Sequence, residues 1–345
     1  MQDKIWRVVE WATGNVGSRA LRTVIEHPRM ELVGLWVSSP EKAGKDAGEL
    51  CGLPATGVRA TNSLDDILAL DADCVLYMRQ GTDWDELCAL LASGKNVITT
   101  RGDFHNPRLM DADIRARVEA ACAKGGTSIY STGSSPGFVT EALAIPLLSL
   151  ERRHGVLTID EFADVSSRDS PEMLFQIMGF GAEMAPFDQR RAEHLKGDFG
   201  SSLSQVADAM GLEIDAIEAF GELSATKQDL TIAAGTVPAG TVGAMRTTIT
   251  CLHKGEPIMR FRANWYVTTD IEHDWDLRES GWRVTTGGDT PVRMDIMFPV
   301  APEDYAAFTP GLTAHRPVNA IPAVCAAAPG IRTTVDLPQI IPIFA

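Results

Sequence analysis

Several features of membrane, secreted and metal-dependent proteins are missing from this 345-residue sequence. No stretch approaches the roughly 18–20 consecutive apolar residues of a membrane span, and the opening segment MQDKIWRVVEW carries charges where a signal peptide has an apolar block. The six cysteines form no C-x-x-C pair and no metal-type spacing, which predicts reduced thiols. We therefore expect a soluble, cytoplasmic protein without a metal site.

Basic residues are too few for a polyanionic partner. Lys and Arg number 31 against 46 Asp and Glu, and the formal net charge of −15 argues against binding to nucleic acid or to an anionic membrane surface. Hydrolase motifs are missing as well, since there is no H-E-x-x-H, no G-x-S-x-G and no Walker loop. Nucleophilic and metal-assisted hydrolysis are therefore poorly supported.

The sequence does contain enough apolar residues for a sizeable core, and its pattern changes along the chain. Hydrophobic residues make up 45% of a length that usually forms two domains. Over residues 1–140, short strands alternate with amphipathic helices, which predicts an α/β Rossmann domain with a doubly wound parallel sheet. Residues 141–305 predict an α+β domain with a mostly antiparallel sheet, entered by a connecting helix over 140–155. A helix and tail over 306–345 are expected to return to the Rossmann domain.

The first strand runs into a glycine turn. The segment VVEWATGNVGS places Ala12 where the dinucleotide-binding pattern G-x-G-x-x-G has its first glycine, and Gly14 and Gly17 keep the other two. Alanine suits that place if its φ stays negative. A plain strand–turn–helix junction would share these letters, but the position at the start of an alternating domain favours a phosphate loop. The predicted cofactor contacts here are Ala12, Thr13, Gly14, Asn15, Val16 and Gly17.

The residues at the end of the second strand indicate whether the dinucleotide is NAD or NADP. NAD sites have an acidic residue there, which holds the ribose 2′-hydroxyl. This chain has Ser38 and Ser39, followed by Lys42 and Lys45, and these side chains suit a 2′-phosphate. NADP is therefore favoured as cofactor, and NAD is also possible. The alternative is a solvated loop whose lysines bind nothing.

Three later strands also end in polar residues, at the edge where open parallel sheets bind ligands. The loop TTRGDFHNP (99–107) carries Arg101, Asp103 and His105, a set suited to acid–base catalysis. A surface turn would use the same residue types, and spacing alone does not separate Asp103 from His105 as the catalytic group. The other predicted cofactor contacts at these strand ends are Met78, Arg79, Thr100, Arg101, Gly133 and Ser135.

Four segments together resemble a known family. WATGNVG, VSSPEKAGKDAGEL, NVITTRGDFHNP and STGSSPGF are similar to the dihydrodipicolinate-reductase-like proteins, in the branch of 2,4-diaminopentanoate dehydrogenase and the native amine dehydrogenases. The resemblance covers residues 1–140 well and the NAIPAVCAAAPGI tail more loosely. It implies a Rossmann domain joined to an α+β domain that binds substrate and forms a homodimer. It also implies reduction, by NAD(P)H, of an imine formed from a carbonyl compound and ammonia.

Two departures narrow what the resemblance implies. True dihydrodipicolinate reductases carry a His-His pair followed by a lysine, and this chain has no such motif, which argues against their reaction. The amine dehydrogenases read T-C-E-E in the loop after the fifth strand. Here the equivalent residues run from Thr100, so that Gly102 falls on the first glutamate and Asp103 on the second.

The expected function is an NADP(H)-dependent amine dehydrogenase that reductively aminates a small aldehyde or ketone, with Asp103 or His105 as the catalytic group. One alternative is the reduction of a cyclic C=N or C=C substrate, and another is a regulatory NADP-binding protein without turnover. The expected partners are a small carbonyl or amine substrate, ammonia and a second copy of the chain.

Overall fold

The structure is a computed structural model that describes residues 4–301 and 304–344. Contacts within the chain divide it into two compact units. The first unit combines residues 1–138 with residues 309–345, and the second holds residues 139–308. In the described parts of the chain, no helix is both long enough and apolar enough to cross a membrane.

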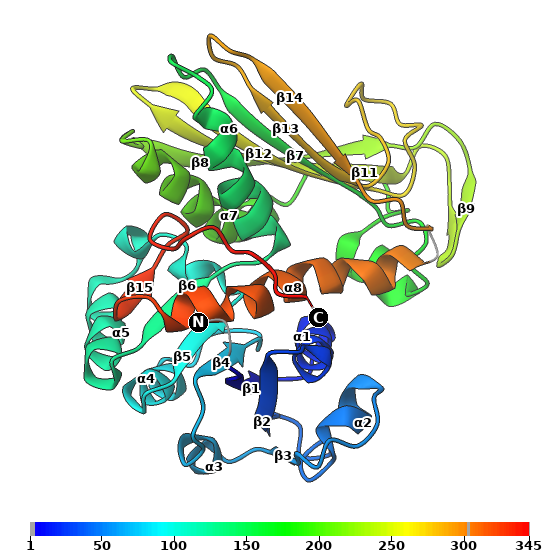
Figure 1. Ribbon diagram of the computed structural model, residues 1–345. Helices are drawn as coiled ribbons and strands as arrows, with labels where there is room; N and C mark the ends of the chain where they lie inside the picture. Colours follow the sequence, from blue (N-terminus) through cyan, green and yellow to red (C-terminus); the bar gives the residue numbers. More distant parts are fainter. Residues whose placement is uncertain (1–3, 302–303, 345) are drawn as a thin grey trace. The chain divides into compact units, whose positions relative to one another are not determined.

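The first unit is built on a parallel sheet of seven strands (Figure 1). The strand order is β15-β6-β5-β4-β1-β2-β3, so the chain changes its direction of travel across the sheet between β3 and β4. This is the doubly wound Rossmann arrangement, and the predicted fold class is confirmed. The strands are β1 (Trp6–Trp11), β2 (Met30–Trp36), β3 (Ala60–Thr61), β4 (Cys74–Tyr77), β5 (Asn96–Thr99), β6 (Ser128–Ser131) and β15 (Gly330–Arg332).

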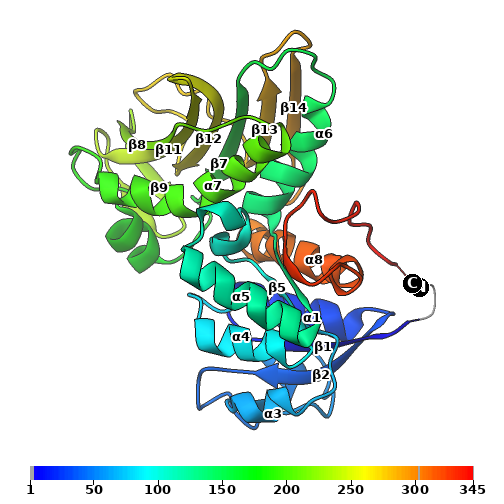
Figure 2. The same ribbon diagram turned by 90° about the vertical axis from the view of Figure 1, so that its left-hand side faces the viewer.

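Helices cover both faces of this sheet (Figure 2). Because side chains alternate along a strand, Val8 packs with Val24 of α1 and Val318 of α8 on one face. The next residue, Val9, packs on the opposite face with Leu90 of α4 and other residues of α3 to α5. The helices are α1 (Asn15–Glu26), α2 (Ala47–Cys51), α3 (Leu64–Leu68), α4 (Trp84–Ala92), α5 (Ala112–Gly125) and α8 (Tyr305–Cys325).

The tail contains a strand that the sequence pattern did not predict. After α8, Gly330–Arg332 form β15, which pairs in parallel with β6. Three residues are too few to produce a recognisable periodicity. The Ser128 hydroxyl also donates to the carbonyl of Val324 (2.6 Å), so both α8 and β15 bind the β6 side of the sheet.

The connecting helix predicted over 140–155 is shorter than expected. Its helical segments are η3 (Ser134–Leu143) and α6 (Ala144–Leu148), so the helix ends at Leu148. Within η3, the backbone angles of residues 135–137 are non-helical. Beyond α6, the backbone N–H groups of Arg152 and Arg153 donate to the Asp289 carboxylate (3.0 and 2.9 Å). These bonds hold residues after 148 in a turn instead of a continued helix.

The second unit contains a six-stranded sheet in the order β14-β13-β7-β12-β11-β8. Neighbouring strands are antiparallel except β7 and β12, so the prediction of a mostly antiparallel sheet is confirmed. The strands are β7 (Leu157–Asp164), β8 (Ala216–Ala225), β11 (Val242–His253), β12 (Glu256–Tyr266), β13 (Gly281–Thr286) and β14 (Val292–Met297). The unit also has the π-helix η4 (Glu172–Met178), the helix α7 (Gln189–Ala209) and a small hairpin of β9 (Leu230–Ile232) and β10 (Gly235–Val237).

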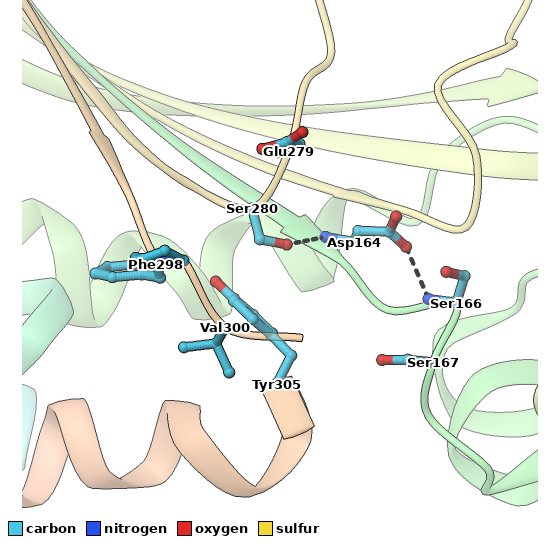
Figure 3. A pocket seen from close by; sticks show the side chains of 9 residues that line it. Asp164, Ser166, Ser167, Glu279, Ser280, Phe298, Val300 and Tyr305 are labelled. Atoms are coloured by element: carbon cyan, nitrogen blue, oxygen red, sulfur yellow. Dashed lines mark hydrogen bonds between the residues drawn. The ribbon is translucent and has the colours of Figure 1, made fainter. Parts of the chain in front are cut away.

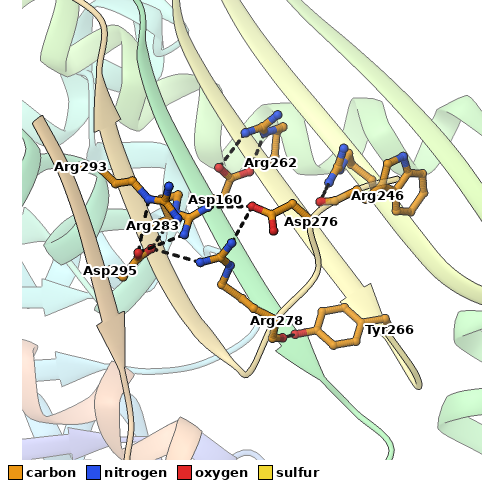
Figure 4. A network of polar contacts seen from close by, with 10 residues as sticks. Asp160, Arg246, Arg262, Tyr266, Asp276, Arg278, Arg283, Arg293 and Asp295 are labelled. Atoms are coloured by element: carbon orange, nitrogen blue, oxygen red, sulfur yellow. Dashed lines mark hydrogen bonds and ion pairs between the residues drawn. The ribbon is translucent and has the colours of Figure 1, made fainter. Parts of the chain in front are cut away.

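The two faces of this second sheet differ in character. On one face Phe261 of β12 stacks on Phe199 of α7, with 3.8 Å between ring centroids. The next residue, Arg262, points to the other face and binds both carboxylate oxygens of Asp160 on β7 (2.5 and 2.7 Å; Figure 4). Charge-assisted pairs with two hydrogen bonds are strong and geometrically specific, so ion pairs organise the face opposite α7.

Glu10 of β1 is a fully buried carboxylic acid with no hydrogen-bond partner among the described residues. It lies beneath the turn that follows β1, since a Cβ placed on Gly17 would come within 3.0 Å of its Oε1 atom. Burial raises the pKa of Glu10 well above its ordinary value. The neutral form is therefore favoured in the folded protein.

The contribution of this buried acid to stability is expected to fall as pH rises. Because the pKa of Glu10 is higher in the folded than in the unfolded chain, its contribution is fully present below the unfolded pKa and is lost as pH rises above it. The slope approaches about 1.4 kcal/mol per pH unit between the two pKa values. Glu10→Gln cannot ionise and is expected to flatten this slope in denaturant unfolding between about pH 4 and pH 8. Parallel stability curves for the two proteins would contradict the prediction.

Candidate active site

The turn after β1 has the backbone conformation of a glycine at its first position. Ala12 has φ +84°, in the left-handed region that disfavours a side chain. The expectation of a negative φ at Ala12 is therefore wrong. Its N–H donates to the carbonyl of Trp36 at the end of β2 (2.9 Å), which holds the turn in place. Alanine, with the smallest side chain, keeps this turn at a cost of about 1–2 kcal/mol.

The other two glycines of the loop are required for different reasons. A Cβ on Gly17 would lie 2.0 Å from the carbonyl oxygen of Ala12, so only glycine lets α1 pack against the turn. A Cβ on Gly14 would meet no atom within 4 Å, so this side of the loop is open. Gly14 is the N-cap of α1 and no side chain caps the helix, which leaves its first N–H groups available to an anion. The loop thus fits a phosphate group.

Lys42 contacts this loop directly. Its Nζ donates to the carbonyl oxygen and to the hydroxyl of Thr13 (3.1 and 3.0 Å). Ser38, which is exposed, and Ser39, which is half-buried, follow β2 at the same edge of the sheet. The structure therefore brings Lys42 beside this loop, whereas Lys45 lies 3.7 Å from Glu49.

Arg79, which follows β4, lies on an aromatic surface. Its guanidinium is 5.7 Å from the ring centroid of Trp36 and forms an ion pair with Glu86. Trp36 in turn stacks on Trp11, with 4.4 Å between ring centroids. Met78, by contrast, packs its side chain in the core and can offer a ligand only its backbone.

Asp103 lies in the short 3₁₀ helix η1 (Gly102–Phe104) after β5. The Thr82 hydroxyl donates to Asp103 Oδ2 (3.0 Å), and Arg101 Nε lies 3.6 Å from the same oxygen. Both contacts use Oδ2, so Oδ1 has no protein partner in the described part of the chain. The Asp103 side chain is 34% exposed. The loop thus presents a fixed carboxylate with one oxygen open to a ligand.

His105, the second predicted catalytic group, lies in a different environment. It is only 2% exposed, and its Nε2 is 3.4 Å from the hydroxyl of Ser131 on β6. Ser131 also donates to the carbonyl of Arg101, which ties the loop after β5 to the neighbouring strand. Asp103 is therefore accessible to a ligand, whereas His105 is enclosed in the core.

The loop after β6 is tightly folded. A Cβ on Gly133 would lie 3.2 Å from the carbonyl oxygen of Pro136, and the Ser135–Pro136 peptide bond is cis. Gly137 has φ +116°, and a Cβ there would lie 2.8 Å from the hydroxyl of Thr132. The Ser135 hydroxyl is a buried group without a partner among the described residues.

The strands β2, β1, β4, β5 and β6 are successive neighbours, so the predicted residues at their carboxyl ends share one edge of the sheet. Sequence reasoning missed Thr82, which holds Asp103, and Trp36, on which Arg79 lies. Thr82 lies at a strand end, but its contact spans 21 residues of chain and no spacing could reveal it. The described residues contain no group of three His, Cys, Asp or Glu side chains that could hold a metal ion.

Two family models match the chain. The N-terminal part of dihydrodipicolinate reductase matches residues 8–102. The C-terminal domain of 2,4-diaminopentanoate dehydrogenase matches residues 170–345, just over half of the chain. The chain belongs to the 2,4-diaminopentanoate dehydrogenase family. The resemblance found in the sequence segments is therefore confirmed.

Individual relatives agree with this assignment. An amine dehydrogenase of Streptomyces virginiae is 29% identical over 343 residues, which cover 96% of this chain and 95% of that protein. The 2,4-diaminopentanoate dehydrogenase of Acetoanaerobium sticklandii is 24% identical over 262 residues, which cover 74% of this chain and 70% of that protein. The solved amine dehydrogenase of Mycobacterium smegmatis has the same fold, with a TM-score of 0.76 at 20% identity over 97% of both chains.

Family membership identifies the chain as an enzyme of the oxidoreductase class. Together with the Rossmann fold and the open phosphate loop, it supports a nicotinamide cofactor.

Proposed function

We propose that this enzyme is an NADP(H)-dependent amine dehydrogenase, which acts on CH–NH₂ and C=N groups. It converts a small aldehyde or ketone and ammonia to the amine, and it catalyses the reverse oxidative deamination. The observation that carries the proposal is the carboxylate of Asp103, fixed through Oδ2 and open at Oδ1 at the carboxyl edge of the sheet. The similarity to an amine dehydrogenase over nearly the full chain supports the reaction class.

In the proposed reaction, Asp103 binds the ammonium group, takes up one of its protons and later returns that proton. Its Oδ1 accepts a hydrogen bond from ammonium and takes up one proton, which frees ammonia to add to the carbonyl carbon. The same proton then leaves with the hydroxyl of the carbinolamine as water, and an iminium forms beside the negative carboxylate, which stabilises it. A nicotinamide held at this edge of the sheet would supply the hydride that reduces the iminium carbon. His105 is enclosed in the core and is assigned the role of supporting the loop.

The test of this function uses purified enzyme with NADPH and a panel of short aldehydes and ketones, with and without ammonia. Ammonia-dependent oxidation of NADPH is expected, with the amine as product. Oxidation of NADPH by a cyclic C=N or C=C substrate without ammonia would favour the alternative reductase. Binding of NADPH without any turnover would favour a regulatory protein.

Lys42, Ser38 and Ser39 support NADP as the cofactor, because they offer a cation and two hydroxyls where NAD sites have a carboxylate. Thr13, Asn15 and the N-terminus of α1 would hold the diphosphate. Arg79, Thr100 and Ser135 stay proposed contacts at the ends of β4, β5 and β6.

Replacing Lys42 with alanine is expected to weaken NADPH binding about tenfold and NADH binding much less, because one charge-assisted contact to the 2′-phosphate is lost. Lys124→Ala is the matched control, since Lys124 is exposed and lies in the last turn of α5, away from the carboxyl ends of the strands. Titration of tryptophan fluorescence with each cofactor measures both affinities. An equal loss for NADPH and NADH would show that Lys42 does not read the 2′-phosphate.

We further propose a homodimer formed through the charged face of the second sheet. Phe220 and Met297 are 57% and 52% exposed, and both are at strand positions that alternate to the same face as Arg262. Light scattering of the purified enzyme tests the assembly.

The six cysteines are free thiols, which suits the proposed site of action in the reducing cytoplasm.

A further inference from the structure

A cavity of about 310 Å³ lies within the second unit and contains none of the residues predicted as a site from the sequence. It is built from the end of β7 and the loop that follows, the turn before β13, the segment after β14 and the start of α8 (Figure 3). Its polar lining includes Asp164, Glu279, Ser280 and Tyr305. A volume of this size matches the lower range of small-molecule sites.

The cavity has two carboxylates and no cationic side chain in its lining. Asp164 Oδ1 accepts the backbone N–H of Ser166 (2.9 Å), and Asp164 N–H donates to the Ser280 hydroxyl (2.9 Å). Asp164 is therefore fixed by its own loop, and its Oδ2 has no protein partner among the described residues. Arg168 acts electrostatically on Tyr305 from outside the lining. The lining itself thus attracts a positive charge.

The remaining walls add a neutral hydroxyl and an apolar surface. Burial raises the pKa of Tyr305, so its phenol stays protonated near neutral pH and can accept a hydrogen bond while it contacts Ser280. Phe298 forms an edge-to-face contact with Trp282 (5.0 Å between ring centroids), and Val300 lies beside Tyr305 (Figure 3). An aromatic ring held by its neighbours presents a firm apolar wall to a ligand.

We propose that this cavity binds a small primary amine, with its ammonium group at Asp164 and its alkyl chain against Phe298 and Val300. An ammonium group has three donors and one positive charge, which match the carboxylate oxygens and hydroxyls of the lining. The choice of an amine over another organic cation rests on the proposed function, in which amines are the product. A metal ion is not favoured, because the described residues include no cluster of three possible ligands.

Calorimetric titration of the full-length enzyme with butan-2-amine, without cofactor, tests the proposal. Saturable binding of the amine is expected, with at least tenfold weaker binding of butan-2-ol and of 2-methylbutanoate. Asp164→Asn keeps an oxygen for the N–H of Ser166 and should weaken amine binding at least tenfold. Asp169→Asn is the matched control, since Asp169 is exposed and outside the lining, and it should bind as the parent does.

A second variant addresses the cavity from another segment. Val300→Trp is expected to fill the space and abolish amine binding, with thermal unfolding recorded for each variant to exclude loss of fold. If Asp164→Asn and Val300→Trp both bind the amine as the parent does, the proposal is overturned. Because no cofactor or turnover is needed, a failed ammonia-dependent assay together with intact, Asp164-dependent binding would reject the proposed reaction and leave this site standing.

Discussion

Replacing Asp103 with asparagine is expected to lower kcat for reductive amination by about two to four orders of magnitude, the usual contribution of a positioned acid–base group. Asparagine keeps an oxygen that accepts from the Thr82 hydroxyl, so the loop should keep its shape. It loses the negative charge and the ability to take up the proton of ammonium. Steady-state kinetics at saturating ammonia and carbonyl compound measure the effect.

Asp85→Asn is the control for this substitution. The Asp85 carboxylate is 90% exposed and pairs with Arg117 on the surface, so its loss should leave kcat unchanged. Both variants should retain the parent's denaturant midpoint within a small margin. An Asp103→Asn enzyme that keeps the parent's kcat would show that the carboxylate does no catalytic work, and the proposed mechanism would be wrong.

Alanine substitutions at the two glycines of the phosphate loop, Gly14 and Gly17, are expected to have different effects on stability and on cofactor binding. Gly17→Ala places a Cβ 2.0 Å from the Ala12 carbonyl oxygen, a backbone atom that cannot move alone. Such overpacking should lower the free energy of unfolding by about 3 kcal/mol and also abolish cofactor binding, because the loop is displaced. Urea unfolding and titration with NADPH measure the two effects.

Gly14→Ala is expected to behave differently. Its φ of −75° suits alanine, and the added Cβ meets no protein atom within 4 Å, so stability should stay close to that of the parent. The same Cβ extends into the open side of the loop, where a phosphate would approach, and should weaken NADPH binding about tenfold or more. Unchanged NADPH affinity in Gly14→Ala would mean that the diphosphate does not bind at this loop.

The sequence by itself determined the fold class and the family. Short apolar strands alternating with amphipathic helices require a parallel sheet with crossovers, because a parallel pair cannot be joined by a tight turn. The glycine spacing of Gly14 and Gly17 and the strand-end segments were enough to indicate the dehydrogenase relatives. These signals are local, because hydrophobic periodicity and the residue types of turns can be recognised in the sequence without the tertiary structure.

The tertiary structure decided which side chains are buried, which backbone angles are adopted and which segments form a cavity, because these depend on contacts between residues far apart in the sequence. It distinguished the accessible Asp103 from the buried His105, although the two residues are separated only by Phe104 and are equally suited by type. It gave Ala12 a positive φ, because the hydrogen bond to Trp36 on another strand outweighs the local preference of alanine. It also joined Asp164, Glu279 and Tyr305, from three separate segments, into one cavity. Burial and pairing across long stretches of chain are set by packing of the whole domain, and no spacing along the sequence encodes them.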